Sequence, residues 1–273
     1  MKYVFFGTPE FAAIILERLI KAGMPPTLVV CNPDRPAGRK KIVTSPPVKF
    51  LAEKHKIQVL QPETFDVETL KYLNSRNLDF AIVAAYSKIL PKRIISSPRL
   101  GTIGVHPSLL PKYRGATPIQ SVILNGEEKT GTTLFLIDEK IDHGPVLAQR
   151  ELEFPILNFK FPRLLQALSE LSADLLIETL PRFVRGEIKP APQNESEATY
   201  TKKFTSQDAF IDLTKDDPAA VDRKVRALNP EPGTWTIQDG KRVKILEAEA
   251  VGNKLVLKKI QMAGKKPTLL KDR

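Results

Sequence analysis

Residues 2–20 have the sequence KYVFFGTPEFAAIILERLI. The first five of these residues form a short apolar run that stops at Gly7, and the apolar residues from Phe11 to Ile20 then recur at helical spacing. This pattern predicts a buried strand, a tight turn and an amphipathic helix. The apolar run is too brief for a secretion signal, so we expect a cytoplasmic protein.

The alternation of strands and helices continues beyond this first unit. Short apolar runs predict strands at residues 27–31, 58–60, 80–85 and 102–105, and helical spacing predicts helices around residues 47–55 and 64–74. Such alternation is typical of an α/β domain with a doubly wound, mostly parallel sheet. Ligands bind at the carboxyl ends of the strands in these sheets, so functional residues are expected in the loops after Phe6, Cys31, Ala85, Val105 and Ile137.

The last third of the chain has a different pattern. An amphipathic helix at residues 163–185 precedes a polar, proline-containing stretch, and a helix at residues 218–228 is followed by short alternating strands. We expect a first domain at residues 1–188, a linker at residues 189–206 and a small β-barrel of the oligonucleotide-binding (OB) type at residues 207–273.

The composition of the chain limits the classes of protein to which it can belong. The chain has 42 Lys and Arg against 31 Asp and Glu, a formal net charge of +11 that favours polyanionic partners. No run of eighteen or more apolar residues is present, so a membrane protein is not expected. Cys31 is the only cysteine, which excludes an internal disulfide and a cysteine-based metal site.

A histidine and a carboxylate stand out among the loop residues. His106 directly follows a predicted strand, and Asp142 lies in the loop after another, with Asp138 four residues earlier. A carboxylate that faces an imidazole orients it and stabilises its charged form, so the pair fits a general base. The plainer alternatives are a turn-stabilising histidine and a solvated acidic loop. Neither the glycine pattern of nicotinamide binders nor a Walker loop is present.

Several motifs resemble the folate-dependent formyltransferase family. They are the segment HPSLLP (residues 106–111), Tyr113-Arg114-Gly115, and Asp142 with Gly144. The segments GTPEFA (7–12), PDRPAGRKK (33–41) and LNPEPGTW (228–235) resemble the members that act on methionyl-tRNA, and together the resemblance covers nearly the whole chain. It implies 10-formyltetrahydrofolate as formyl donor, no metal, and a monomer that binds initiator methionyl-tRNA and no membrane.

The resemblance also assigns residues to roles. It implies His106 and Asp142 as catalytic residues, folate contacts at Tyr86, Ser108, Leu109, Leu110 and Pro111, and tRNA contacts at Arg35, Arg39, Lys40 and Lys41. Gly104 stands where the family has a catalytic asparagine. An oxyanion donor is worth about 3 kcal/mol, so its loss slows turnover unless a water or a backbone N–H replaces it.

Two alternatives remain at this stage. One is an N-formyltransferase for an amino sugar or another small amine, although a small acceptor gives no reason for the basic segment at residues 35–41. The other is a weakly active or non-catalytic tRNA-binding homologue, which the glycine at position 104 favours. Salt-sensitive tRNA affinity separates the first alternative from the main prediction, and formyl transfer separates the second.

Overall fold

The computed structural model describes residues 1–37, 41–153, 156 and 158–270. The chain forms two compact units. Unit 1 comprises Met1–Arg114, Gly131–Leu152 and Gln166–Thr199, and unit 2 comprises Gly115–Thr130, Glu153–Leu165 and Tyr200–Arg273. Each unit is therefore assembled from segments that are distant in the sequence.

Unit 1 is built on a seven-stranded sheet with the order β10-β9-β7-β6-β1-β2-β5. Its strands are β1 (Tyr3–Gly7), β2 (Leu28–Val30), β5 (Val59–Leu60), β6 (Phe80–Ala84), β7 (Thr102–His106), β9 (Gly131–Leu136) and β10 (Val146–Glu151). The five strands from β7 to β5 are parallel, and β9 and β10 are antiparallel additions at one edge. The predicted α/β fold with a mostly parallel sheet is confirmed.

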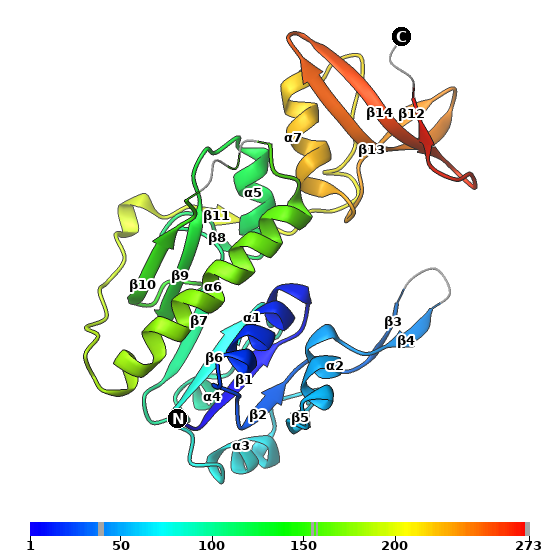
Figure 1. The fold of residues 1–273 in the computed structure, drawn as a ribbon. Helices are drawn as coiled ribbons and strands as arrows, with labels where there is room; N and C mark the ends of the chain where they lie inside the picture. The colour runs from blue at the N-terminus through cyan, green and yellow to red at the C-terminus, as the bar shows by residue number, and fades with distance from the viewer. Residues whose placement is uncertain (38–40, 154–155, 157, 271–273) are drawn as a thin grey trace. The chain divides into compact units, whose positions relative to one another are not determined.

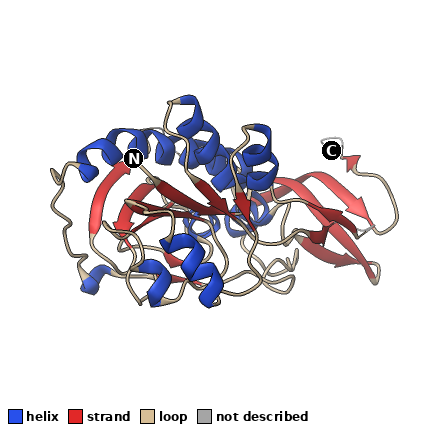
Figure 2. Ribbon diagram, turned by 90° about the horizontal axis from the view of Figure 1, so that it is seen from below, coloured by secondary structure: helices blue, strands red, loops and turns tan. Residues whose placement is uncertain are grey.

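Helices cover both faces of this sheet, as Figure 2 shows. They are α1 (Glu10–Lys21), α2 (Pro47–Lys54), α3 (Val67–Asn74), α4 (Lys92–Ile95) and α6 (Phe161–Val184). Because side chains alternate along a strand, Val4 and Phe6 of β1 pack with α3 and α4 on one face. On the opposite face Tyr3 stacks on Phe80, and Phe80 meets Phe183 of α6 edge-on. A sheet buried on both faces explains the continuous apolar runs of its strands.

The turn after β1 depends on glycine. A β-carbon on Gly7 would lie 2.6 Å from Cβ of Ala12 and 3.1 Å from the carbonyl oxygen of Ala84. A side chain at this position would push α1 away from the sheet. Gly7 therefore explains how the helix starts so close to the carboxyl end of β1, where ligands of such sheets bind.

Unit 2 is organised around an antiparallel sheet with the order β12-β13-β14-β15. Its strands are β12 (Trp235–Gln238), β13 (Lys241–Val251), β14 (Lys254–Met262) and β15 (Thr268–Leu269), and its helices are α5 (Pro118–Leu124) and α7 (Pro218–Leu228). Val221 and Val225 of α7 pack on Ile245 of β13. The predicted small β domain after the α/β domain is thus present as a four-stranded sheet and a helix.

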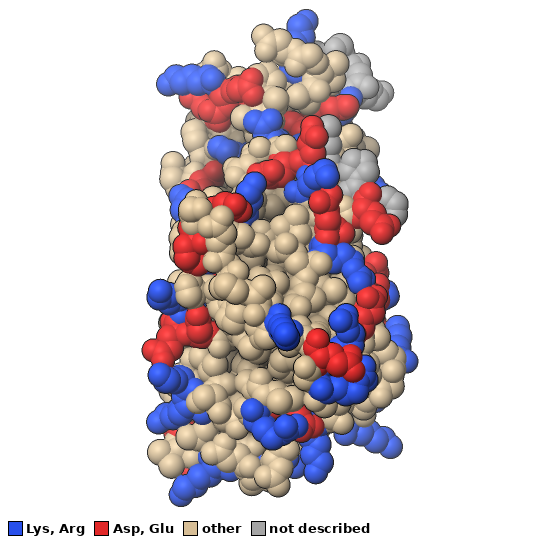
Figure 3. Space-filling model, turned by 90° about the vertical axis from the view of Figure 1, so that its left-hand side faces the viewer, with Lys and Arg blue, Asp and Glu red and all other residues tan. Residues whose placement is uncertain are grey.

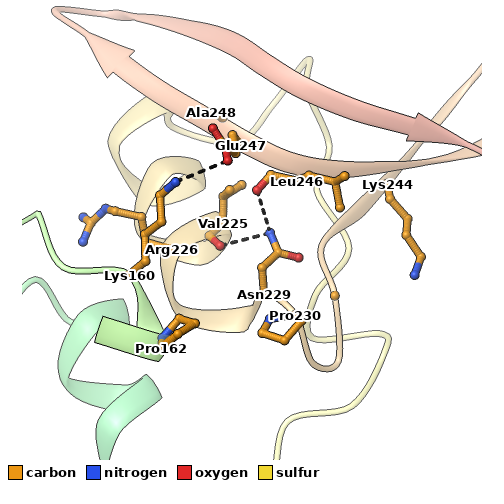
Figure 4. Close-up of a pocket in the computed structure, with 11 residues that line it drawn as sticks. Lys160, Pro162, Val225, Arg226, Asn229, Pro230, Lys244, Leu246, Glu247 and Ala248 are labelled. Atoms are coloured by element: carbon orange, nitrogen blue, oxygen red, sulfur yellow. Dashed lines mark hydrogen bonds and ion pairs between the residues drawn. The ribbon is translucent and has the colours of Figure 1, made fainter. Parts of the chain in front are cut away.

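Asn229 joins the end of α7 to β13. Its Nδ2 donates to the carbonyl oxygens of Val225 (3.1 Å) and Ile245 (3.0 Å), and Figure 4 shows it between the helix and the strand. The asparagine therefore supplies a donor for the carbonyl oxygen of Val225, one of the carbonyl groups at the end of α7 that have no partner within the helix.

The remaining short elements are β3 (Arg35–Ala37), β4 (Ile42–Thr44), β8 (Arg114–Gly115), a 3-10 turn (Glu195–Glu197) and β11 (Tyr200–Thr201). Strands β3 and β4 pair as a hairpin, and Figure 1 shows them extending from unit 1 beside α2. Within the described part of the chain, no helix combines the length and apolar character needed to cross a membrane.

Candidate active site

His106 is the last residue of β7, and its backbone pairs with Thr133 of β9, one residue beyond the last pair that β7 forms with β6. Its side chain is buried, with 5% of the residue exposed. Nε2 lies 2.7 Å from the carbonyl oxygen of Tyr113, and Nδ1 lies 3.5 Å from Oδ2 of Asp142. Of the two carboxylates considered from the sequence, Asp142 is therefore the one that faces His106.

The two contacts of His106 define what the ring can do. A neutral imidazole has one N–H and one lone pair. Nε2 contacts the carbonyl oxygen of Tyr113, and Nδ1 faces the carboxylate of Asp142. The two contacts fix the orientation of the ring at the end of β7.

The loop that carries Asp142 is tightly constrained. Asp142 adopts a left-handed backbone conformation with φ 47°, and a β-carbon on Gly144 would lie 1.7 Å from the carbonyl oxygen of Leu136. Only glycine fits there, so Gly144 allows the loop to turn back onto the end of β9. Asp138 points elsewhere: its Oδ2 lies 2.6 Å from Nδ1 of His143.

Phe135 fills the space beside Gly104. The two residues are opposite each other on β9 and β7, and a β-carbon on Gly104 would lie 2.4 Å from Cε1 and 2.5 Å from Cζ of the ring. Cγ1 of Ile137 would lie 3.1 Å from the same point. A side chain at position 104 would therefore overlap with the ring of Phe135 unless the ring moved.

The residues expected to contact folate after β7 differ in exposure. Ser108 is fully buried, and its Oγ donates to the carbonyl oxygen of Lys112 at 2.6 Å. Leu110 is 5% exposed, and its N–H donates to Oγ1 of Thr133. Leu109 and Pro111 are half-buried. Ser108 and Leu110 therefore shape the loop from inside, and Leu109 and Pro111 have the accessible surface.

Tyr86 lies after β6, at the same edge of the sheet. Its ring is T-shaped to those of Phe6 and Phe65, with centroids 5.7 Å and 6.2 Å away. Burial raises the pKa of Tyr86, so its hydroxyl remains a hydrogen-bond donor. That hydroxyl is buried and has no partner among the described residues.

Asn32 is a residue of this edge that we did not predict. It follows β2, its Nδ2 donates to Oγ of Ser87, and its buried Oδ1 has no partner within the described ranges. Oδ1 of Asn32 and the hydroxyl of Tyr86 are thus two buried polar atoms without a partner among the described residues, which is uncommon in folded proteins. Asn32 could have been predicted from the sequence, because it directly follows the strand expected at residues 27–31, at the edge where ligands of such sheets bind.

Two residues of the basic segment belong to or adjoin the strands of the β3–β4 hairpin: Arg35 lies in β3, and Lys41 directly precedes β4. Arg35 and Lys41 are exposed, and Nη2 of Arg35 lies 2.8 Å from Oε2 of Glu63. Arg39 and Lys40 lie outside the described residues. Strand β4 also exposes Ile42 and Val43. The hairpin is therefore a solvent-exposed element with basic and apolar side chains.

Unit 2 contains a pocket with basic residues around apolar walls (Figure 4). Nζ of Lys160 lies 3.5 Å from Oε1 of Glu247, and Nε of Arg226 lies 2.8 Å from Oδ2 of Asp222. Lys244 has no ion-pair partner in the described part of the chain.

On the face of the molecule drawn in Figure 3, basic and acidic side chains are interspersed rather than gathered by sign. Across the described residues, no group of three or more His, Cys, Asp or Glu could hold a metal ion.

Comparison with protein families gives two matches. Residues 1–180 match the formyl transferase family, and residues 203–255 match the formyl transferase C-terminal domain. The chain is 44% identical over 250 residues to the methionyl-tRNA formyltransferase of Chloroflexus aurantiacus, covering 91% of this chain and 80% of that protein. It is 43% identical over 252 residues to that of Thermotoga maritima, covering 92% and 80%.

Solved structures share the fold at lower identity. Methionyl-tRNA formyltransferase from Clostridium thermocellum has a TM-score of 0.62 at 15% identity and covers 96% of this chain and 98% of its own. An N-formyltransferase from Helicobacter canadensis, in complex with folinic acid and dTDP-3-aminofucose, has a TM-score of 0.66 at 20% identity, covering 97% and 96%. HypX from Aquifex aeolicus with tetrahydrofolic acid has 0.68 at 19%, covering 99% and 46%.

Proposed function

The chain belongs to the formyl transferase family, and on that premise we propose that it transfers a formyl group from 10-formyltetrahydrofolate to the amino group of methionyl-tRNA. The observation that carries this proposal is the 43–44% identity to methionyl-tRNA formyltransferases over nine-tenths of the chain. The fold does not choose the acceptor, because an amino-sugar enzyme and a methionyl-tRNA enzyme both match it.

The reaction joins the methionyl nitrogen to the formyl carbon and breaks the bond between that carbon and the folate nitrogen. The attacking ammonium must lose a proton, and the departing nitrogen must gain one. We propose that Nε2 of His106 takes this proton and returns it to the departing nitrogen once the substrates replace the carbonyl oxygen of Tyr113 as its partner, while Nδ1 keeps facing Asp142 at 3.5 Å. The proton that the ammonium loses is then the one that the departing nitrogen gains, and this transfer needs no metal.

Gly104 changes how the developing oxyanion is stabilised. Glycine at position 104 offers no side-chain donor, and Phe135 occupies the space that the β-carbon of a larger residue would need. We propose that protonated His106 is the principal donor. On this basis the enzyme is active but slower than asparagine-containing relatives, by a factor on the order of a hundred.

The formyl donor is proposed to bind at the edge formed by the loops after β2, β6 and β7. The accessible surfaces of Leu109 and Pro111, and the unsatisfied groups of Tyr86 and Asn32, support this assignment. We assign residues 1–188 to folate binding and catalysis and residues 207–273 to tRNA binding, with residues 189–206 between them in the sequence.

The acceptor is proposed to be the initiator form of methionyl-tRNA, bound by a monomer in the cytoplasm. The net charge of +11 and the exposed cations Arg35 and Lys41 support a polyanionic acceptor, and Arg39 and Lys40 belong to the same segment of sequence. A tRNA contact through phosphates positions the acceptor, whereas choice of the initiator requires contacts to bases.

The test is formyl transfer by the purified full chain, with 10-formyltetrahydrofolate as donor. Acceptors are initiator methionyl-tRNA, elongator methionyl-tRNA and a nucleotide-linked amino sugar. We expect transfer to the initiator tRNA, loss of transfer in His106→Ala, and no product from the sugar. Formylation of the sugar alone would overturn the acceptor, and tRNA binding without transfer would support the non-catalytic alternative that Gly104 favours.

A further inference from the structure

The polar stretch at residues 189–199 belongs to unit 1 and is hydrogen-bonded to other parts of it near both ends. Ala191 pairs with Val146 of β10 through two backbone hydrogen bonds of 2.7 Å and 2.9 Å. Farther along, the N–H of Arg114 donates to the carbonyl oxygen of Thr199 at 2.8 Å. The stretch that we predicted as a linker from its composition therefore brings side chains to the candidate active site.

Arg114 is the anchor for these side chains. It is fully buried, and its guanidinium makes a two-pronged contact with Glu195, with Nη2–Oε1 2.6 Å and Nη1–Oε2 2.9 Å. The same guanidinium donates to Oε1 of Gln193 from Nε (3.1 Å) and Nη2 (2.7 Å). A buried charge needs such partners, so the pairing is costly to break.

The pairing with Arg114 fixes which way the amide of Gln193 points. Oε1 must accept from the guanidinium, and Nε2 therefore faces away from it. Nε2 donates to the carbonyl oxygens of Asp142 (2.9 Å) and Gly144 (2.8 Å). Both donors and the acceptor of Gln193 are used, and the two carbonyls flank His143 in the loop that presents Asp142 to His106.

We propose that Gln193 is a positioning residue that holds Asp142 in register with His106, and that Arg114 and Glu195 hold Gln193. This inference rests on the proposed formyl transfer. The left-handed backbone of Asp142 is an unfavourable conformation that surrounding contacts must maintain. Without Gln193 the loop loses two of them, and the carboxylate is no longer held 3.5 Å from Nδ1.

The expected effect is on turnover rather than on substrate binding. Misplacement of a reacting group by about 1 Å costs on the order of a hundredfold in rate. We expect Gln193→Ala to lower kcat at least tenfold, with KM for both substrates within about twofold of wild type. Gln193→Glu keeps an acceptor for Arg114 but has no donor for the loop, so it should lower kcat as well.

The deciding experiment compares these variants with Gln166→Ala, which removes an exposed glutamine amide whose Nε2 donates to Glu170. Each is also placed in an Asp142→Asn background. If Gln193 acts through Asp142, Gln193→Ala costs little further in that background. A full multiplicative loss there, or a change confined to KM, overturns the inference.

Amide hydrogen exchange at residues 138–144 provides a readout that does not require activity. Exchange should rise in Gln193→Ala and Gln193→Glu and stay unchanged in Gln166→Ala. Unchanged exchange in the Gln193 variants overturns the inference. An inactive wild type overturns the proposed function instead, and the exchange result still decides whether Gln193 holds the loop.

Discussion

The ring of Phe135 occupies the space that a side chain on Gly104 would need, with Cε1 and Cζ only 2.4 Å and 2.5 Å from the position of a β-carbon. The two residues are directly opposite on antiparallel strands. The glycine and the aromatic ring therefore form one packing unit, and substitution of either must be considered with the other.

Gly104→Asn alone is expected to destabilise the protein. Because the ring must move, the free energy of unfolding should fall by about 1–3 kcal/mol. Gly104→Asn combined with Phe135→Leu should recover part of that loss, since the shorter side chain vacates the overlap. Urea denaturation of wild type, both single variants and the double variant measures the coupling. If the loss in free energy of unfolding of the double variant equals the sum of the losses of the two single variants, the two positions are independent.

The same double variant tests the cost of the missing amide. If an asparagine at position 104 can reach the oxyanion once the ring is shortened, kcat should rise by about tenfold or more over Phe135→Leu alone. The comparison with Phe135→Leu controls for the altered packing. No rise, in a protein that remains folded, would mean that His106 already supplies what the oxyanion needs.

His106 and Asp142 should differ in how much their loss costs. His106→Ala removes the proton acceptor and should lower kcat by about a hundredfold to ten-thousandfold, whereas Asp142→Asn keeps the shape and removes the charge that stabilises the ring. Initial rates at saturating substrates measure both. His55→Ala is the control, because His55 is exposed at the end of α2. Near-normal turnover in His106→Ala would refute the mechanism.

The single thiol should be unreactive in the folded protein. Cys31 is fully buried after β2, and burial is the main cause that raises its pKa to about 11. At pH 8 only about one thiol in a thousand is then ionised, and the thiolate is the reactive form. We expect no rapid reaction with a disulfide reagent until denaturant is added, when one thiol per chain should react. Rapid stoichiometric labelling of native protein would contradict this.

The strands of unit 1 could be predicted because burial on both faces requires apolar runs. Strand β1 is buried along its whole length, and its residues are nearly all apolar. Strand β10 was not predicted, because VLAQRE at the sheet edge has a single buried residue, Leu147, and its second half is polar. The position of His106 after a buried strand was sufficient to place it at the ligand edge.

The partners of the site residues could not be predicted, because they depend on register and on contacts between distant segments. Nothing in the sequence places Phe135 opposite Gly104, since that requires the pairing of β7 with β9. Gln193 and Glu195 are about eighty positions from Arg114 and lie in a stretch whose composition predicts a linker. A buried arginine needs acceptors, but its sequence neighbours do not identify them.

The ion pair of Arg114 and Glu195 should give a pH-dependent contribution to stability. The hydrogen bond and charge of Arg114 lower the pKa of Glu195 below its ordinary range. A carboxyl whose pKa is lowered by folding contributes stability above its unfolded pKa, and that contribution is lost as the pH falls through the folded pKa. Wild type should therefore melt above Glu195→Gln at pH 7, and the difference should shrink as the pH drops below about 4.

Thermal unfolding between pH 3 and 7 measures this difference, with Glu170→Gln as the control for loss of an exposed carboxylate. The side chain of Glu195 is 55% exposed, so added salt should reduce the effect as well. A difference between wild type and Glu195→Gln that stays constant over the whole pH range would contradict the assignment of the shift to Arg114.

Glu63 should oppose the binding of tRNA to the β3–β4 hairpin. Its Oε2 lies 2.8 Å from Nη2 of Arg35, so a phosphate must compete with this carboxylate for the guanidinium. Arg35→Gln and Lys41→Gln should each weaken tRNA binding and reduce the slope of log affinity against log salt by about one. Glu63→Gln should strengthen binding. Lys71→Gln, an exposed change on α3, is the control.

The salt dependence separates a phosphate contact from a general charge effect. Fluorescence anisotropy of labelled tRNA at several salt concentrations gives both affinity and slope for each variant. If Lys71→Gln weakens binding as much as Arg35→Gln does, the affinity reflects net charge and not the hairpin. If Glu63→Gln strengthens binding in the wild-type background but not in the Arg35→Gln background, its effect acts through Arg35, and the hairpin is a direct contact for the acceptor.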